Sequence, residues 1–297
     1  MNKRLFKSTA GVTLIELLIA LVVSAILVAG IYRVFIHQQR TYRTQEDVAD
    51  MQQNVRVAIN RMIREIRMAG FGGKNENTNG NNDIINVFGN VNTFTSIINP
   101  ANDVTVDGII HDQITLLAAY DQIATLEEDV VAGSNSFKVN FTGNTRFDQP
   151  WRKYVCINGR NSYAIIPAGG DTLTLEGGGT LNENHSAGEP VFLVRAIRYG
   201  LRMDNGTSVL FRDLYPATGG SQRVTVAENI EALQFRYVLA DSSEVDTPGD
   251  PRQVRGVRVT LTARTQMSDP ELKTGGGFRR RTLVTYIDLR NLRDETP

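Results

Sequence analysis

Cysteine, histidine and excess charge are the scarcest features of this sequence. The 297 residues include one cysteine, Cys156, which excludes an internal disulfide framework and a cysteine-rich zinc module. The three histidines, His37, His111 and His185, lie too far apart in the sequence to favour a histidine-based metal site. Lys plus Arg and Asp plus Glu both number 32, so net charge gives no general attraction to nucleic acid or acidic lipid. We therefore expect no cofactor and no metal.

Enzyme motifs are also scarce. The glycine clusters lack the lysine and spacing of a phosphate-binding loop, and no dinucleotide fingerprint follows a strand. His111-Asp112 and Asn184-His185 could each form half of an acid–base pair, but such neighbours are common in loops. Cys156 lies in an apolar run typical of a buried strand, so we expect a small core residue rather than a nucleophile. The sequence predicts a protein that is not an enzyme.

One long apolar segment dominates the start of the chain. Lys3, Arg4 and Lys7 come first, and residues 12–32 then carry a single charge, Glu16. As a helix this segment would be about 31 Å long, the thickness of a hydrocarbon core. The basic residues before it favour a cytoplasmic N-terminus. A secretory signal peptide has a shorter apolar core and a small-residue cleavage site, so removal at the far end is the less favoured interpretation.

Glu16 is unusual in such a segment, because a carboxylate there costs about 2.5–3.5 kcal/mol on insertion scales. In one interpretation Glu16 is protonated or lies near enough to the interface to reach water. In the other, it pairs with a positive group of a neighbouring protein. If the chain were cut after Gly11, the new amine of Val12 would supply that group one helical turn away on every copy.

Residues 11–21, GVTLIELLIAL, resemble the prepilin cleavage and methylation segment of type IV pilins and type II secretion pseudopilins. The resemblance implies that a prepilin peptidase cuts after Gly11 and methylates Val12. It also implies that Glu16 neutralises the N-terminal amine of an adjacent subunit during assembly. The sequence departs from the common pattern at Val12, where phenylalanine is usual, and in lacking a helix-kinking proline, which leaves Gly30 as the weak point.

Apolar residues spaced by three and four predict that one helix continues from residue 12 to about residue 68. Such a helix would be about 85 Å long. We expect Gly70, Gly72 and Gly73 to end it. The second half is expected to present an apolar stripe to a folded domain: Val48, Met51, Val55, Ile59, Met62 and Ile66.

The segment 72–83 is rich in Asn and Gly and is predicted to be a solvated loop. Its Asn77, Asn79, Asn81 and Asp83 alternate as in a calcium loop, but one carboxylate among four is a weak indication of a metal site. From about residue 84 onward the pattern is that of β-structure, with an Asn-Gly hairpin turn at 205–206. The predicted strands are 136–141, 154–157, 163–166, 172–175, 190–203, 208–214, 232–239, 254–264 and 282–289.

These features predict an α+β fold: a long N-terminal pilin-type helix, membrane-inserted in its first half, packed on a C-terminal antiparallel β-rich domain. The expected divisions are a prepilin leader (1–11), the helix (12–68) and a periplasmic or extracellular domain (84–297). Residues 226–237, VAENIEALQFRY, resemble PilW-type minor pilins and J-type pseudopilins, as do 254–264 and 279–285. With the length of the chain, this resemblance favours the PilW type.

The resemblance to minor pilins implies a structural subunit of the inner membrane. After processing it would join other minor pilins and the major pilin, in a complex that primes type IV pilus assembly near the tip. The alternative is a J-type pseudopilin of a type II secretion system. An alternative of another class is a signal-anchored periplasmic binding protein, for which Gly11 and Glu16 would be accidental.

Arginines gather in two places of the β-rich region. The first group is Arg195, Arg198 and Arg202, and the second is Arg279, Arg280 and Arg281. Some minor pilins bind DNA, and basic stripes beside aromatic residues suit nucleic acid. Arg198 and Arg202 alternate with apolar residues, which favours the solvated face of a half-buried sheet over a nucleic-acid site. These arginines could equally face acidic surfaces of partner pilins.

Overall fold

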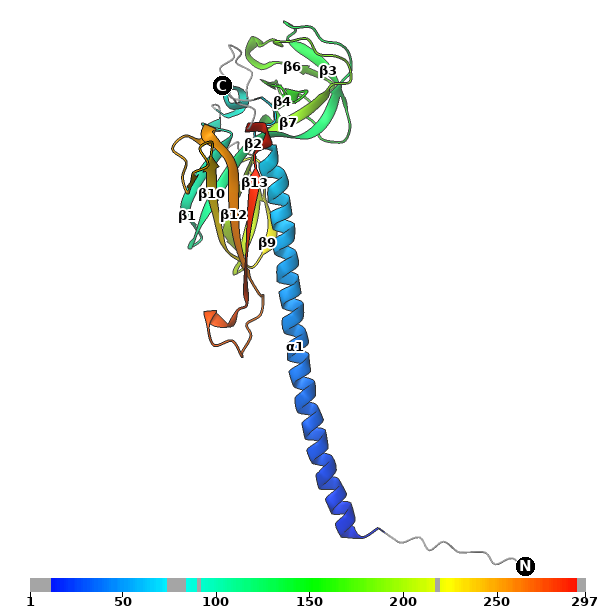
Figure 1. Cartoon of the computed structure of the whole chain (residues 1–297). Helices are drawn as coiled ribbons and strands as arrows, with labels where there is room; N and C mark the ends of the chain where they lie inside the picture. Colours follow the sequence, from blue (N-terminus) through cyan, green and yellow to red (C-terminus); the bar gives the residue numbers. More distant parts are fainter. Residues whose placement is uncertain (1–11, 74–83, 90–91, 217–219, 293–297) are drawn as a thin grey trace, which may run out of the picture. The chain divides into compact units, whose positions relative to one another are not determined.

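A computed structural model describes residues 12–73, 84–89, 92–216 and 220–292 of the chain (Figure 1). The predicted leader and the candidate calcium residues Asn77, Asn79, Asn81 and Asp83 lie outside the described residues. The chain divides into two compact units, Met1–Asp50 and Met51–Pro297. The helix α1 (Leu14–Met68) contributes to both units, and all strands belong to the second.

Thirteen strands follow the helix in the described part of the chain. They are β1 (Ile98–Val106), β2 (Ile109–Leu126), β3 (Ser136–Phe141), β4 (Tyr154–Ile157), β5 (Asn161–Ala164), β6 (Thr172–Thr174), β7 (Pro190–Asp204), β8 (Thr207–Asp213), β9 (Arg223–Glu228), β10 (Ile230–Leu239), β11 (Glu244–Val245), β12 (Val254–Arg264) and β13 (Arg280–Asp288). The short helical turns are η1 (Ile85–Gly89), η3 (Pro150–Arg152), η4 (Glu176–Gly178), η5 (Pro251–Gln253), η6 (Gly275–Gly277) and η7 (Arg290–Leu292). The predicted combination of a long N-terminal helix and antiparallel β-structure is confirmed.

The first sheet is built around two long strands, β2 and β7, which pair with each other along most of their length. At one end they continue into β1, β8 and β9. At the other end they continue into β3 and β4, and the order becomes β5-β4-β7-β2-β3-β6. A bridge between Ile165 and Leu175 joins β5 to β6, so this end closes into a small barrel (Figure 1). Closure removes the unpaired edges that an open sheet would expose.

The barrel has its own apolar core. Large buried side chains from every part of its wall meet there, including Phe137, Phe147, Ile157, Leu173 and Leu193. The pairing of β2 with β7 shifts register at two places, between Ala119 and Asp121 and between Gln122 and Ala124. Such bulges bend and twist a strand, which lets β2 leave the open part of the sheet and enter the barrel.

The second sheet has the order β11-β10-β12-β13. Buried residues alternate with accessible ones along β12, so the sheet has one buried and one open face. Asp112 of β2 is buried and joins the two sheets: its carboxylate accepts hydrogen bonds from the backbone N–H of Asp103 (3.1 Å) and of Phe235 in β10 (2.8 Å). This carboxylate therefore serves the fold rather than acid–base chemistry with His111.

The second half of α1 packs into the Met51–Pro297 unit. Its buried residues are Met51, Val55, Ala58, Ile59, Met62 and Ile66. The predicted stripe is confirmed except for Val48, which is only half-buried. Each fully buried aliphatic side chain of this kind contributes about 1.5–3 kcal/mol, so the stripe anchors the helix to the β-structure.

The helix ends where the glycines predict. The backbone of Gly70 has φ +82° and its N–H donates to the carbonyl of Leu117 (3.0 Å). The side-chain amide of Asn291 lies within 3.3–3.4 Å of the last helical carbonyls, those of Arg67, Met68 and the following Ala69. Carbonyls at a helix end have no partner within the helix, and here a residue more than 200 positions away in sequence supplies one.

Gly159 is a position in this unit where we expect a methyl group to be tolerated poorly. Its φ is +72°, and a Cβ there would lie 2.5 Å from the ring of Phe71, which packs edge-on against Phe192. Gly159→Ala combines left-handed strain with overpacking, and we expect a loss of about 2–4 kcal/mol in the free energy of unfolding. Gly133→Ala is the matched control, because its φ is +89° but nothing lies within 4 Å. Urea unfolding of both variants tests this, and equal losses would contradict the contact.

Candidate assembly segment

The start of α1 is fixed by two residues that bond each other. The N–H of Glu16 donates to Oγ1 of Thr13 (3.3 Å), and the N–H of Thr13 donates to Oε2 of Glu16 (2.9 Å). The Thr13 hydroxyl also donates to the same carboxylate oxygen (3.0 Å). A threonine followed three residues later by a glutamate forms the capping box that begins many helices. The TLIE sequence at 13–16 therefore sets the helix start and holds the Glu16 side chain in place.

This arrangement leaves Glu16 ready for a second partner. Both hydrogen bonds from Thr13 end on Oε2, and within the described residues none reaches Oε1. Val12 precedes the capping box and is 73% exposed. Gly11, the predicted cleavage position, lies outside the described residues. Cleavage after Gly11, methylation of Val12 and the pairing of Glu16 with a neighbouring amine stay predictions.

The apolar stretch that follows is exposed, and no other part of the described chain covers it. An 18-residue window of α1 is long and apolar enough to cross a membrane, and none of it is buried. Its large exposed side chains are Leu14, Ile15, Leu17, Leu18, Ile19, Leu21, Val22, Val23, Ile26, Leu27, Val28, Ile31, Val34 and Phe35. The helix runs through Gly30, around which nothing lies within 4 Å. Uncovered apolar surface of this extent indicates burial in a membrane or against other helices.

Glu65 ties the other end of α1 to the first sheet. Its carboxylate accepts a hydrogen bond from the Tyr199 hydroxyl (2.6 Å) and forms an ion pair with Arg212 (2.7 Å). The side chains of Glu65 and Arg212 are only 12% and 8% exposed. Arg61, one helical turn earlier, lies 3.5 Å from the same carboxylate but is much more exposed. These contacts fix the position of the helix along β7 and β8, which carry Tyr199 and Arg212.

Burial and charge set the protonation states in this cluster. Burial, and then the Glu65 carboxylate, raise the pKa of Tyr199 far above its usual range. Burial raises the pKa of Tyr120 in the same way. Both phenols therefore stay neutral hydrogen-bond donors at physiological pH. The Glu65 carboxylate accepts from one of these phenols and pairs with the Arg212 guanidinium, which is a structural arrangement that holds the helix on the sheet.

The arginines of β7 are used within the chain. Arg195 is buried, pairs with Asp121 (2.5 Å) and lies about 6 Å from the ring centres of Tyr120 and Tyr215. Arg198 and Arg202 are half-buried, and Arg202 pairs with Asp204 at 3.0 Å. The first arginine group is therefore not a continuous exposed basic surface.

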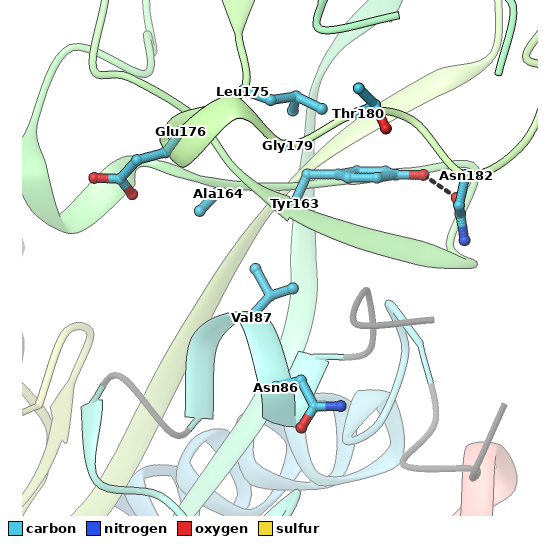
Figure 2. A pocket seen from close by; sticks show the side chains of 9 residues that line it. All are labelled: Asn86, Val87, Tyr163, Ala164, Leu175, Glu176, Gly179, Thr180 and Asn182. Atoms are coloured by element: carbon cyan, nitrogen blue, oxygen red, sulfur yellow. Dashed lines mark hydrogen bonds between the residues drawn. The ribbon is translucent and has the colours of Figure 1, made fainter. Parts of the chain in front are cut away.

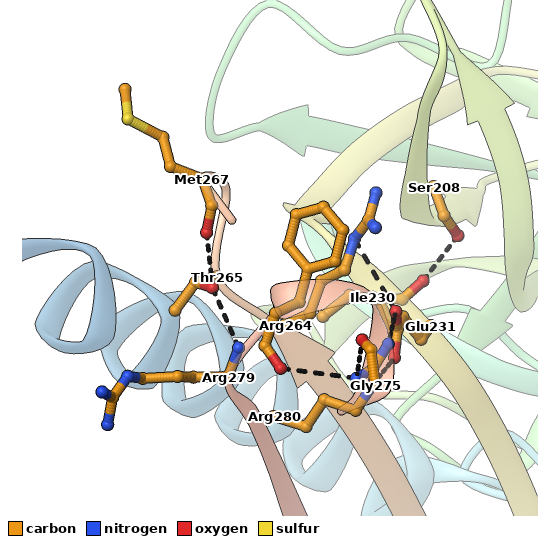
Figure 3. A network of polar contacts seen from close by, with 10 residues as sticks. Ser208, Ile230, Glu231, Arg264, Thr265, Met267, Gly275, Arg279 and Arg280 are labelled. Atoms are coloured by element: carbon orange, nitrogen blue, oxygen red, sulfur yellow. Dashed lines mark hydrogen bonds and ion pairs between the residues drawn. The ribbon is translucent and has the colours of Figure 1, made fainter. Parts of the chain in front are cut away.

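The second arginine group braces the loop between β12 and β13 (Figure 3). Arg280 pairs with Glu231 (2.5 Å) and donates to the carbonyl of Gly275 (2.6 Å). Arg279 pairs with Asp269 (2.7 Å), and Arg264 lies 4.1 Å from the ring centre of Phe278. Since two of the three arginines at 279–281 are neutralised by carboxylates of the same chain, the cluster supports nucleic-acid binding poorly.

Neither histidine forms the side-chain pair with its sequence neighbour that the sequence suggested. His185 is buried, and its Nδ1 lies 2.9 Å from the Glu189 carboxylate rather than against Asn184. His111 is buried, with Nδ1 lying 3.2 Å from the carbonyl of Ile109. Among the described residues, no group of three or more His, Cys, Asp or Glu side chains could hold a metal ion.

His111 predicts a pH dependence of stability. Burial lowers its pKa below the usual 6.5, outweighing the hydrogen bond with the Ile109 carbonyl and the attraction of Asp112, which both act to raise it. The unfolded chain therefore binds a proton that the folded chain rejects, and stability falls as the pH drops below about 6.5. We expect His111→Gln to show a smaller loss between pH 7.5 and 5.5, by at most about 1.4 kcal/mol per pH unit. Urea unfolding of the detergent-solubilised chain at both pH values measures this, and identical slopes would contradict it.

A cavity of about 510 Å³ lies between η1 and the barrel (Figure 2). Three of the polar side chains that line it have partners within the chain: Tyr163 donates to Asn182, and Glu176 pairs with Lys153 at 2.6 Å. Cys156, the candidate core cysteine, is fully buried, and burial raises the pKa of its thiol to about 12. A thiol with that pKa stays protonated and is a poor nucleophile.

Comparison with known families agrees with the geometry of the helix start. Residues 6–32 match the prokaryotic N-terminal methylation motif. No curated protein sequence matches the chain. The chain thus carries a prepilin-type cleavage and methylation motif, of the kind found in type IV pilins and pseudopilins. The motif match ends at residue 32, so it describes the helix start and not the β-rich unit.

Proposed function

We propose that this chain is a minor pilin of the PilW type, a non-catalytic subunit that takes part in type IV pilus assembly. The observation that carries the proposal is the combination of a methylation motif with an apolar helix segment that no described residue of the chain covers. In an assembled filament, helices of neighbouring subunits would cover that segment. The proposed divisions are a removable leader (1–11), the helix (12–68) and the β-rich domain (84–297).

The proposed mechanism combines packing of the apolar helix surface with the charge of one residue, Glu16. A prepilin peptidase removes the leader after Gly11 and methylates Val12 in the inner membrane. The apolar surface of the helix then packs against neighbours, and Glu16 pairs with the amine of an adjacent subunit. A polar group satisfied in only one alignment specifies register even when its net contribution is small. The β-rich domain, facing the periplasm or the cell surface, makes lateral contacts with other minor pilins and the major pilin.

A J-type pseudopilin of a type II secretion system is the second candidate, because the same motif and helix serve both machines. Gene deletion distinguishes them. Our proposal predicts that deletion lowers the number of surface pili and leaves protein secretion unchanged, and that the full-length gene restores piliation. Loss of secretion with normal piliation would favour the pseudopilin. A signal-anchored binding protein predicts that both remain normal and that no leader is removed.

A further inference from the structure

The cavity between η1 and the barrel has the size of a small-molecule site. Its volume of about 510 Å³ falls within the range of roughly 300–1,000 Å³ that such sites occupy. One wall is formed by η1 through Asn86 and Val87, and the other by β5 and the loop that follows β6 (Figure 2). All of these residues belong to the Met51–Pro297 unit.

The loop that follows β6 is held in place at both ends. Leu175 and Leu181 are buried in the barrel core. Their backbone N–H groups donate to the carbonyls of Asn135 (2.8 Å) and Ser134 (2.9 Å) respectively. Residues 176–180 between the two leucines are exposed. A segment fixed in this way holds its side chains in position before a ligand arrives, which lowers the entropic cost of binding.

A chain of hydrogen bonds orients the polar groups at one end of the cavity. The hydroxyl of Tyr163 donates to Oδ1 of Asn182, whose Nδ2 donates to Oδ1 of Asn161 (3.1 Å). Asn161 in turn donates to the carboxylate of Glu183 (2.7 Å). Burial raises the pKa of Tyr163, so its phenol stays a neutral donor. The Asn182 amide is therefore fixed beside the cavity.

Four polar groups at the cavity keep hydrogen-bonding capacity that the described chain does not use. Asn182 has a second amide hydrogen, and the Tyr163 oxygen can still accept. Glu176 binds Lys153 through Oε2 at 2.6 Å, and within the described residues Oε1 has no partner. The Thr180 hydroxyl also has none there. The cavity thus offers both donors and acceptors to a ligand.

The charge of the cavity excludes ionic ligands. Among the described residues that line it, Glu176 is the only charged one, and Lys153 already neutralises it. A phosphate or carboxylate ligand would need an unpaired cation, and a divalent metal ion would need further oxygen ligands of negative charge. A purely apolar ligand would leave the amide and hydroxyl groups without partners. A neutral, polar ligand fits these conditions.

The apolar part of the lining narrows the class of ligand further. In Figure 2 the flat ring of Tyr163 lies above Val87 of η1, with Leu175 on the same side as the barrel. A pyranose ring presents C–H groups on its faces and hydroxyls at its edge. The C–H groups suit an aromatic face and a valine, and each hydroxyl can both donate and accept.

We propose that this cavity binds a neutral sugar ring, either free or as one unit of a longer glycan. Tyr163 and Val87 contact the faces of the ring, and its hydroxyls bond to Glu176, Thr180 and Asn182. The inference goes beyond the proposed function and does not rest on it, because none of these residues belongs to the helix that carries the methylation motif.

Saturation-transfer difference NMR on the full-length chain tests the proposal. The chain is held in a zwitterionic, sugar-free detergent, since maltoside detergents would compete. The probes are the methyl β-glycosides of glucose, galactose and N-acetylglucosamine, with the methyl glucuronide as the charged counterpart. We expect at least one neutral glycoside to bind at least fivefold more tightly than the glucuronide. Tighter binding of the corresponding β-linked disaccharide would support a longer glycan as the source of the ring.

Substitutions then place the bound sugar in the cavity. Thr180→Trp fills the space from an exposed position, and we expect it to weaken binding at least tenfold. Glu176→Ala removes one acceptor and should weaken binding about fivefold, whereas Glu176→Gln, which keeps an acceptor oxygen, should restore most of it. The matched controls are Thr172→Trp and Glu128→Ala, at exposed residues outside the lining, and should leave affinity unchanged.

Two results would overturn the proposal. One is the absence of binding by all of the neutral glycosides at about 20 mM, which is well above the dissociation constant of a millimolar site. The other is unchanged affinity in both Thr180→Trp and Glu176→Ala, with thermal unfolding like that of the wild type. Chains that begin at Val12 but bind no glycoside would refute this inference alone. Glycoside binding by chains that keep Met1 would support it and refute the pilin pathway.

Discussion

Glu16→Gln is expected to be cleaved normally after Gly11 and to fail in assembly. Glutamine can keep the hydrogen bonds of the capping box with Thr13, so the helix start survives. It cannot neutralise the amine of a neighbouring chain. Leaving one partner of a buried pair without its counter-charge costs about 3–5 kcal/mol, which corresponds to a fall on the order of 100-fold or more in the assembly equilibrium. The measurement is the amount of this chain in sheared pili relative to membranes.

Thr13→Ala is the matched control for this prediction. It removes the capping hydroxyl but keeps the Glu16 charge, and a lost N-cap costs about 1 kcal/mol. The difference of at least about 2 kcal/mol means that we expect its assembly defect to be about 30-fold smaller, or more, than that of Glu16→Gln. Normal incorporation of Glu16→Gln would mean that the carboxylate serves only the capping box, and the charge-pairing mechanism would be wrong.

Glu65→Ala is expected to destabilise the Met51–Pro297 unit more than any other single change to the charged residues of α1. It leaves the Arg212 guanidinium buried without its carboxylate and removes the acceptor of Tyr199. Breaking a buried ion pair costs about 3–5 kcal/mol. For a unit of this size that corresponds to a fall of roughly 10 °C in Tm. Thermal unfolding of the detergent-solubilised chain, followed by circular dichroism, measures it.

Arg61→Ala provides the comparison, because Arg61 contacts the same carboxylate from an exposed position. An exposed pair contributes about 1 kcal/mol or less, so the expected fall in Tm is a few degrees at most. If Glu65→Ala were no more harmful than Arg61→Ala, the buried cluster would not fix the helix on the sheet.

The elements of this fold that could be predicted from the sequence are those with a local residue pattern. The helix pattern predicted α1 and its buried stripe, and the Asn205-Gly206 pair predicted the turn between β7 and β8. Both turn residues have positive φ, +50° and +81°, as a two-residue hairpin of this type requires. The predicted strand 254–264 agrees with β12, whereas the predicted strand 163–166 is two residues later than β5.

The contacts between distant segments, including those that close the barrel, could not be predicted from the sequence. β2 was missed because most of its middle residues are buried on both faces, so Leu116–Ala119 shows no alternation of polar and apolar residues. The barrel depends on the bridge between Ile165 and Leu175, which no local pattern encodes. The Glu65 cluster was missed for the same reason, since Tyr199 and Arg212 lie 134 and 147 residues further along the chain. The only signal in the sequence was a carboxylate next to the apolar stripe of a helix.

The expectation for the arginines illustrates the same limit. Alternation placed Arg198 and Arg202 on a solvated face, but both are half-buried and Arg202 is paired. A strand such as β7, which is covered on both faces for much of its length, still alternates in side-chain direction. Which face is covered depends on packing partners elsewhere in the chain.

The most direct test of the central claim is the mass of the N-terminus. Membrane-extracted protein would be analysed by intact-mass and N-terminal peptide mass spectrometry, from cells with and without prepilin peptidase. We predict a chain that begins at Val12, with or without one added methyl group, only when the peptidase is present. A chain that keeps Met1 in both strains, or one cut near Ala29 and Gly30, would contradict the pilin pathway and with it the proposed function.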